Sequence, residues 1–165
     1  MKNIIIILSI SIVLISIILV IVFINYRNNI SKIGSFDLLV KSGADINVKD
    51  KDGNTLLMYA CMNSNISIVK LLIDNKVDVN AKNNEGKTSL MFACEIGDVA
   101  IVQLLLDSNA NVNDIDNYGN TALMFSSKKS SVSVISLLLK YGANVHNINN
   151  DSDTALLFLL KNTNK

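Results

Sequence analysis

The chain has 165 residues, half of them hydrophobic, and a formal net charge of +1. Beyond Lys2 the chain carries 14 basic and 14 acidic residues, and they form no basic stripe. Nucleic-acid binding leaves a basic electrostatic footprint, so this composition argues against a nucleic-acid partner.

Residues 4–24 form an uncharged apolar run that only Ser9, Ser11 and Ser16 interrupt. At about 1.5 Å per residue, a helix of this length spans roughly 30 Å, the thickness of a bilayer's hydrocarbon core. A helix is also the only viable single-pass form, because lipid cannot satisfy unpaired backbone groups. We therefore predict a transmembrane helix over residues 4–24, between a short tail (residues 1–3) and a juxtamembrane linker (residues 25–33).

A cleaved signal peptide is the alternative reading of the same run. It predicts a shorter apolar region that ends in small residues, whereas this run ends Val22-Phe23-Ile24-Asn25 with no Ala-x-Ala pattern. The sequence thus favours an uncleaved signal-anchor and a single-pass membrane protein. Lys2 precedes the run while Arg27 and Lys32 follow it, so the positive-inside rule is nearly balanced. The signal-anchor pattern places the following domain outside the cytoplasm.

A six-residue motif then recurs at a step of 33 residues. It occupies residues 53–58, 86–91 and 119–124, and a diverged copy occupies residues 152–157. A fixed period of this length indicates stacked supersecondary units, none of which buries its apolar face alone. We expect a half repeat at residues 34–49, full repeats at 50–82, 83–115 and 116–148, and a partial repeat at 149–165.

Within the unit at residues 50–82, Asp52-Gly53 indicates a turn, and Thr55 suits a helix N-cap. A short helix through about Met62 and a second helix from Ile66, with an apolar stripe at helical spacing, follow. Cys61 and Cys94 are equivalent residues of neighbouring units, about 10 Å apart at the usual helix spacing. That separation is too large for a disulfide, so we expect two small buried residues.

These motifs resemble ankyrin repeats. The resemblance rests on Gly-x-Thr-x-Leu, a small-residue pair, Ile-Val-x-Leu-Leu and Gly-Ala-Asp-Ile-Asn or its variants, and it covers about residues 34–165. It implies an all-α repeat solenoid with β-hairpin-like loops, preceded here by the transmembrane helix. One departure is that Met58, Met91 and Met124 stand where the family usually has His. We expect their thioethers to pack in the core rather than to bind metal or haem.

The resemblance further implies a protein-binding scaffold that recognises its partner through a concave face, at the hairpin tips and the exposed side of each first helix. Tyr118, beside Ile115, has the amphipathic character of a binding hot spot, although it equally fits a ring lying over its own hairpin. An alternative function is a regulatory or immunity-type inhibitor that masks a partner enzyme or toxin. The candidate partner-binding residues are Lys49, Lys51, Asp52, Asn54, Met62, Asn63, Lys82, Asn84, Glu85, Lys87, Glu95, Ile96, Ile115, Asn117, Tyr118, Asn120, Lys128 and Lys129.

No catalytic, cofactor-binding or metal-binding pattern stands out, so we expect a non-enzymatic protein without a cofactor. The single histidine, His146, takes the place that Asn47, Asn80 and Asn113 hold in other units, which indicates a structural role. In the partial repeat, Leu159 and Leu160 replace the small pair. This exchange predicts either a surface for self-association or a truncated array with a poor cap.

Overall fold

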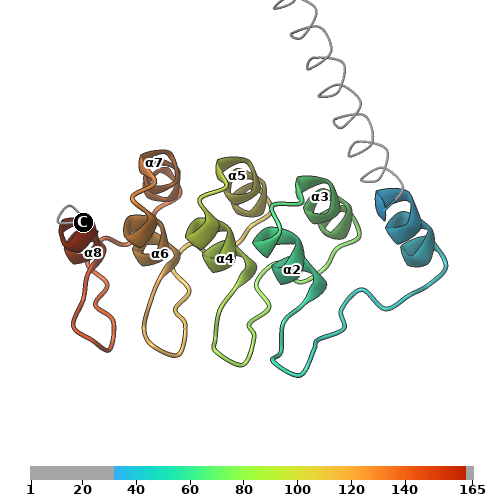
Figure 1. Ribbon diagram of the computed structural model, residues 1–165, viewed down its shortest axis with the longest axis horizontal. Coiled ribbons are helices and arrows are strands. Elements are labelled where there is room, and N and C mark those ends of the chain that lie inside the picture. Colours follow the sequence, from blue (N-terminus) through green and yellow to red (C-terminus); the bar gives the residue numbers. More distant parts are fainter. Residues whose placement is uncertain (1–31, 163–165) are drawn as a thin grey trace, which may run out of the picture. The chain divides into compact units, whose positions relative to one another are not determined.

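The computed structural model describes residues 32–162 (Figure 1). The chain divides into two compact units between Ala44 and Asp45. In the first unit, residues 32–41 are helical. The predicted transmembrane helix at residues 4–24 lies outside the described residues. Among residues 32–162, no helix has both the length and the apolar character needed to cross a membrane.

The second unit consists of alternating short helices joined by loops. Each pair of helices is followed by a long hairpin-like loop (Figure 1). The first helices of the pairs are α2 (Leu56–Met62), α4 (Ser89–Ile96), α6 (Ala122–Lys129) and α8 (Ala155–Asn162). The second helices are α3 (Ile66–Asp74), α5 (Val99–Asp107) and α7 (Val132–Lys140).

Each first helix begins at a threonine of the repeated motif. The Thr55 hydroxyl accepts a hydrogen bond from the Met58 amide (3.3 Å), and Thr88, Thr121 and Thr154 do the same for the residue three positions later. These bonds satisfy a backbone donor that has no partner within the helix. In α2 the Met58 sulfur also accepts from the Thr55 amide (3.4 Å), which completes a capping box.

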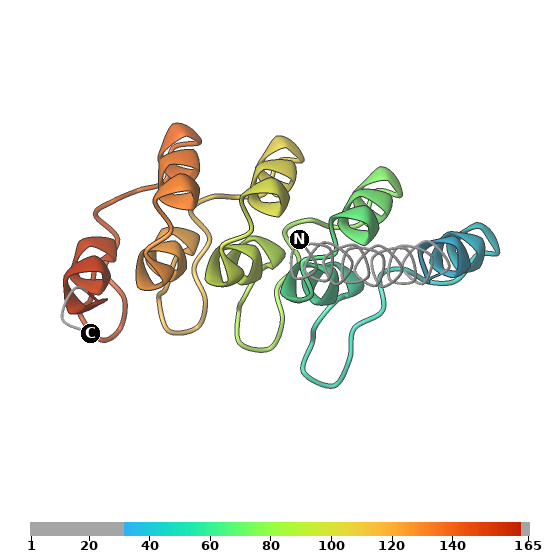
Figure 2. The ribbon, with the colours of Figure 1, turned by 45° about the horizontal axis from the view of Figure 1, so that its top comes forward.

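The helices form two rows. Figures 1 and 2 both show α2, α4, α6 and α8 side by side in one row and α3, α5 and α7 in the other. The long loops extend from the row of first helices (Figure 1). In the described residues these loops contain no strand longer than an isolated bridge, such as the antiparallel bridges Lys49–Thr55 and Ile115–Thr121. The prediction of an all-α repeat fold with hairpin-like loops is confirmed for this unit.

The core lies between the two rows and repeats with the sequence. Leu57, Leu90 and Leu123 are at most 3% exposed, and Met58, Met91 and Met124 are buried beside them. The three methionines therefore pack in the core, as we expected. Cys61 and Cys94 are buried free thiols. Burial raises the pKa of the Cys61 thiol to about 12 and also raises the pKa of Cys94, so neither is a reactive nucleophile.

Candidate binding surface

One side chain just before the tip of each long loop shapes that tip. The Asp50 carboxylate accepts hydrogen bonds from the amides of Asp52 (2.9 Å) and Asn54 (2.7 Å). The equivalent Asn83, Asp116 and Asn149 accept from the amides two and four residues later in the same way. Asx side chains commonly hold turns by this pattern. The four tips consequently share one backbone conformation.

An asparagine ladder fastens each tip to the preceding one. Its members are Asn84, Asn117 and Asn150, 33 residues apart. Each backbone amide donates to a carbonyl of the previous tip at 2.9–3.0 Å. Each side-chain amide donates to a second carbonyl of that tip at 2.9–3.2 Å. We predicted Asn84 and Asn117 as partner contacts. Their side-chain amides donate to the previous tip and hold the tips in register, and both residues remain exposed.

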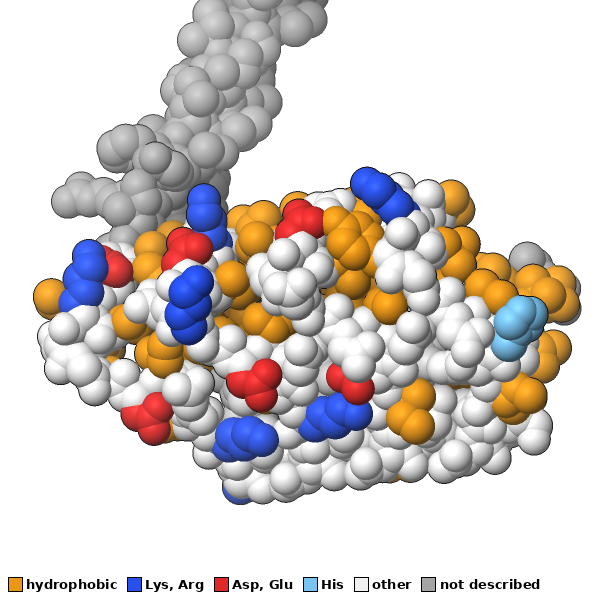
Figure 3. All heavy atoms as spheres, turned by 180° about the vertical axis from the view of Figure 1, so that it is seen from behind, with side chains coloured by type: hydrophobic (Ala, Val, Ile, Leu, Met, Phe, Trp, Pro, Cys, Tyr) orange, Lys and Arg blue, Asp and Glu red, His pale blue; other side chains and the backbone are white. Residues whose placement is uncertain are grey.

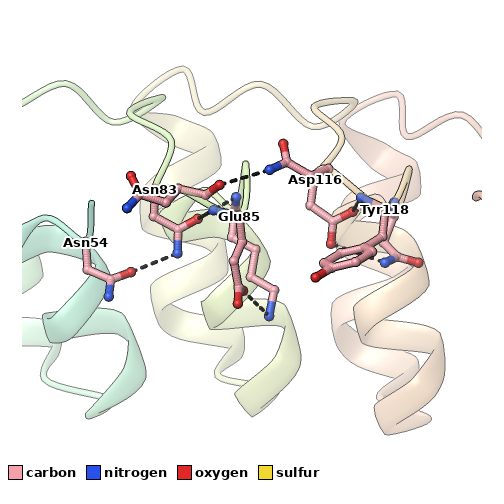
Figure 4. Close-up of polar contacts among 9 residues, drawn as sticks. Asn54, Asn83, Glu85, Asp116 and Tyr118 are labelled. Atoms are coloured by element: carbon pink, nitrogen blue, oxygen red, sulfur yellow. Dashed lines mark hydrogen bonds and ion pairs between the residues drawn. The ribbon is translucent and has the colours of Figure 1, made fainter. Parts of the chain in front are cut away.

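Asn54 and Asn120, two further candidates, belong to a second network beneath the tips. The Asn83 side chain donates to Asn54 (2.8 Å; Figure 4), and Asn54 donates to the Asp50 carboxylate (3.3 Å). The bonds from Asn149 to Asn120 (2.7 Å) and from Asn120 to Asp116 (3.2 Å) repeat this relay two units later. Asn54 and Asn120 are half-buried, and their side chains connect the loops of neighbouring units.

A row of aromatic side chains lies along the first helices, one per unit. We call Tyr59, Phe92, Phe125 and Phe158 the aromatic row; the four residues are spaced by 33 positions. Tyr59 is 44% exposed and the three phenylalanines are half-buried. Our reading of the sequence missed this row, because an aromatic residue inside a short apolar helix looks like core. The recurrence of an aromatic residue in every unit, next to core positions that Leu and Met already occupy, could have revealed the row.

Charged groups surround the aromatic row. The Lys87 ammonium lies 5.6 Å from the Phe92 ring centroid and 5.4 Å from that of Phe125, and it forms an ion pair with Glu85 (3.4 Å; Figure 4). The Tyr59 hydroxyl donates to the Asp50 carboxylate (2.6 Å). This bond is the largest cause of the lowered pKa of Asp50 and the raised pKa of Tyr59, since it favours the ionised carboxylate and the neutral phenol.

Two hollows bring the predicted residues together around this row. One hollow, of about 290 Å³, is lined by Phe92 and by the candidates Asp52, Asn54, Met62, Asn84 and Glu85. The other, of about 160 Å³, is lined by Phe125 and Phe158 with the candidates Asn120 and Lys128. In both hollows a hairpin tip, an aromatic ring and the end of a first helix meet. Tips and helix ends, which we predicted as separate recognition elements, are therefore parts of one continuous surface.

The remaining candidates lie around this surface without lining either hollow. Lys51 and Tyr118 are exposed at loop tips, and the Tyr118 side chain is 57% exposed. Glu95, Ile96 and Lys129 are exposed at the ends of first helices. Ile115 is 49% exposed in the stem of its loop, where its carbonyl accepts a bond from Lys82 (3.2 Å). Lys49 similarly donates to the Lys82 carbonyl (3.0 Å).

The described residues contain no group of three or more His, Cys, Asp or Glu side chains arranged to hold a metal ion. His146 is exposed, and its amide donates to Asn144 (2.9 Å). Asn80 and Asn113 hold the equivalent position in earlier units. The Asn80 side chain donates one hydrogen bond to the backbone of the loop after α5 and accepts another from it, and the Asn113 side chain does the same with the loop after α7. No second helix follows α8 within the described residues, so His146 has no such loop to clamp.

Comparison with known proteins identifies the repeat itself. A family model described as ankyrin repeats, in three copies, matches residues 27–116 and 75–149. These two matches together cover most of the chain. No curated protein matches the sequence.

Proposed function

The chain belongs to the ankyrin repeat family, and we propose that it is a membrane-tethered scaffold that binds a protein partner through its hairpin tips and first helices. Ankyrin repeats generally mediate protein–protein interaction and are typically non-enzymatic. The observation that carries the proposal is the aromatic row with its charged surroundings. Aromatic side chains of this kind, partly exposed next to polar groups, are enriched at binding hot spots.

The surface suits a partner because its frame is ordered before binding. The asparagine ladder fixes each tip to its neighbour, and the Asp50 and Asn83 side chains accept hydrogen bonds that fix the loop backbones. Binding therefore orders few additional backbone groups, which lowers the entropic cost of association. The hollows between adjacent units accept side chains, while the exposed lysines and acidic residues set polarity around them. A protein segment that runs along several units fits this arrangement.

Alanine substitutions on the two faces test this assignment. A Phe92→Ala and Tyr118→Ala double variant alters the proposed surface, whereas Val99→Ala and Val132→Ala alter exposed aliphatic residues of the second helices. The wild type and both double variants are each incubated with native membranes, and bound partners are captured with the same crosslinker. We expect the first variant to lose partners that the wild type and the second variant retain. An identical set of partners from all three proteins would exclude this face as the binding surface.

We also propose that residues 4–24 tether the protein to the membrane and that the repeats lie outside the cytoplasm. The support is the length and uncharged character of the run and the short Lys-containing tail before it. Alkaline phosphatase and green fluorescent protein fusions at the C-terminus report the side directly. Phosphatase activity without fluorescence is the expected result, and the reverse pattern would place the repeats in the cytoplasm.

A further proposed partner is another copy of the chain, bound through the C-terminal partial repeat at residues 149–165. Leucines replace the small residue pair there, and Leu160 is 56% exposed. Apolar exposure of this kind at the end of a repeat stack normally requires a cap or a partner.

A further inference from the structure

The C-terminal end of the repeat stack carries an open apolar groove of about 560 Å³. We call it the terminal groove. Its walls come from α6, α7, α8 and the loop between α7 and α8, and its aliphatic residues include Ile135, Leu139, Val145, Ile148, Leu156 and Leu159. Figure 3 shows hydrophobic side chains gathered at this end of the molecule, around the pale-blue histidine.

Equivalent residues of the inner units show that the groove is an interior surface left uncovered. Leu156 is 66% exposed, whereas its equivalent Leu123 is 3% exposed. Leu139 is 44% exposed, whereas its equivalent Leu106 is 4% exposed. In the inner units the following repeat covers these side chains, and none of the described residues covers them here.

We propose that a second copy of this chain covers the terminal groove, in a tail-to-tail dimer with the two α8 helices packed side by side about a two-fold axis. The inference deepens the self-association proposed above and does not depend on the aromatic row. A two-fold contact sets the same patch of both subunits face to face, so a charged patch would repel itself. The residues that line the groove include no Lys, Arg, Asp or Glu. Self-pairing of the groove residues therefore carries no like-charge penalty.

Helix α8 supplies the side chains that would fill the partner's groove. Leu156, Leu157 and Leu160 are 66%, 40% and 56% exposed, and Leu156 and Leu160 lie one helical turn apart on the same side of the helix. Within the chain, α8 packs against α6 as α6 packs against α4. A second α8 would take the place that the next first helix of the row would hold. The two-fold axis would then pair the outer face of α8 with the same face of its copy, which differs from the contact that joins successive units.

The size of the patch agrees with a dimer interface. Six aliphatic residues at this end are each at least 40% exposed, namely Leu139, Val145, Ile148, Leu156, Leu157 and Leu160. Together they present on the order of a few hundred Å² of apolar surface, the scale of the largest apolar patch on a monomer, which is often a functional surface. A standard interface buries about 800 Å² per partner, with an apolar centre and a polar rim. The patch forms that centre, and the polar side chains of the loop between α7 and α8 form part of the rim.

Light scattering coupled to size-exclusion chromatography of the full chain in detergent micelles tests the dimer. We expect the wild type to be a dimer and Leu156→Asp to be a monomer. The dissociation constant of the variant dimer should exceed that of the wild-type dimer more than about tenfold, because two carboxylates would be buried at the two-fold axis. The aspartate lies in the first turn of α8, where a negative charge is favourable, so the helix persists and circular dichroism should be unchanged.

The matched control is Ile66→Asp. It places the same charge in the first turn of α3, at a side chain that is 44% exposed and on the face of a different unit. This variant should remain a dimer. Both variants keep residues 1–31, so any association through that segment contributes equally to the two measurements.

Crosslinking locates the contact independently. Leu160→Cys should give a covalent dimer with a short bismaleimide, whereas Ser67→Cys, an exposed position on α3, should not. The native Cys61 and Cys94 are buried and have raised pKa values, so they give no background. A wild-type monomer would exclude self-association altogether. A dimer that survives Leu156→Asp and fails to crosslink at position 160 would exclude only the terminal groove, and in both cases the partner-binding proposal for the aromatic row would stand.

Discussion

At the scale of single residues, the hairpin tips meet through a few atoms, and a glycine in each of the first three tips leaves the space for that contact. A Cβ on Gly53 would lie 2.5 Å from the side-chain oxygen of Asn84 and 2.8 Å from the backbone nitrogen of Asn84, which belongs to the next tip. The equivalent residue of the last tip is Ser152, with φ of +64°. No further tip approaches Ser152 among the described residues. The positive φ alone therefore does not require glycine; the approach of the next tip does.

This contact predicts that Gly86→Ala destabilises the protein much more than Gly142→Ala. Both glycines have positive φ, at +76° and +84°, which costs an alanine about 1–2 kcal/mol. The new methyl group at position 86 would also lie 2.6 Å and 2.9 Å from Asn117 atoms, while position 142 has nothing within 4 Å. We expect a loss of about 3 kcal/mol or more for Gly86→Ala in urea unfolding. Equal losses for the two variants would contradict the role of the tip contact.

The Tyr59–Asp50 hydrogen bond makes a second prediction at this scale. Tyr59→Phe removes the bond that contributes most to the lowered pKa of Asp50, so that pKa should rise toward its ordinary value of 3.8. NMR titration of the Asp50 carboxyl carbon measures it. Tyr118→Phe, at a loop tip in another unit, is the control and should leave the pKa of Asp50 unchanged. An unshifted pKa in Tyr59→Phe would mean that the backbone amides and the Asn54 side chain stabilise the carboxylate without the phenol.

The pH window in which this bond stabilises the fold follows from the directions of the two pKa shifts. The pKa of Asp50 is lower in the folded state, so its contribution is present above 3.8 and is lost as pH falls through the folded pKa. The pKa of Tyr59 is higher in the folded state, so its contribution is present below 10.0 and is lost as pH rises through the folded pKa. The stability difference between the wild type and Tyr59→Phe should accordingly be largest between these limits.

At the scale of helices, the sequence was informative wherever the determinants are local. Threonine caps and apolar spacing predicted a first helix that ends at about Met62 and a second that begins at Ile66, and the structure has α2 at Leu56–Met62 and α3 at Ile66–Asp74. The asparagine ladder and the aromatic row were not predicted. Both depend on which side chains of neighbouring units come together, and a single unit read by itself does not contain that information.

The caps of the second helices differ from unit to unit, and this difference predicts a stabilising substitution. Asn65 and Asp98 cap α3 and α5 through their side chains (3.2 and 3.1 Å), whereas Ser131 makes no side-chain bond to α7. Ser131→Asp places at α7 the carboxylate that already caps α5. We expect a gain of about 0.5–1 kcal/mol in the free energy of unfolding. The reciprocal variant Asp98→Ala should lose about 1 kcal/mol, and no change in either variant would show that these caps contribute little here.

At the scale of the repeat stack, stability depends on nearest neighbours, because each unit contacts only the units beside it. Helix α4 has first helices on both sides and buries five of its eight residues. Helix α8 has one neighbouring first helix, α6, and Ala155 is its only described residue that is buried. The end of the stack therefore has the least packing energy per helix, and it is also where the terminal groove lies.

This gradient predicts that amide hydrogens of α8 exchange fastest among the helices from α2 to α8 and those of α4 slowest, with a difference of at least about tenfold. Hydrogen exchange measured by mass spectrometry on the full chain tests it. A comparison of the wild type with Leu156→Asp then separates packing within the chain from packing between chains. If two copies meet at the terminal groove, the wild type should protect α8 more than the variant does, while α4 is protected equally in both. Equal protection of α8 in the two proteins would mean that α8 derives its order only from its contact with α6.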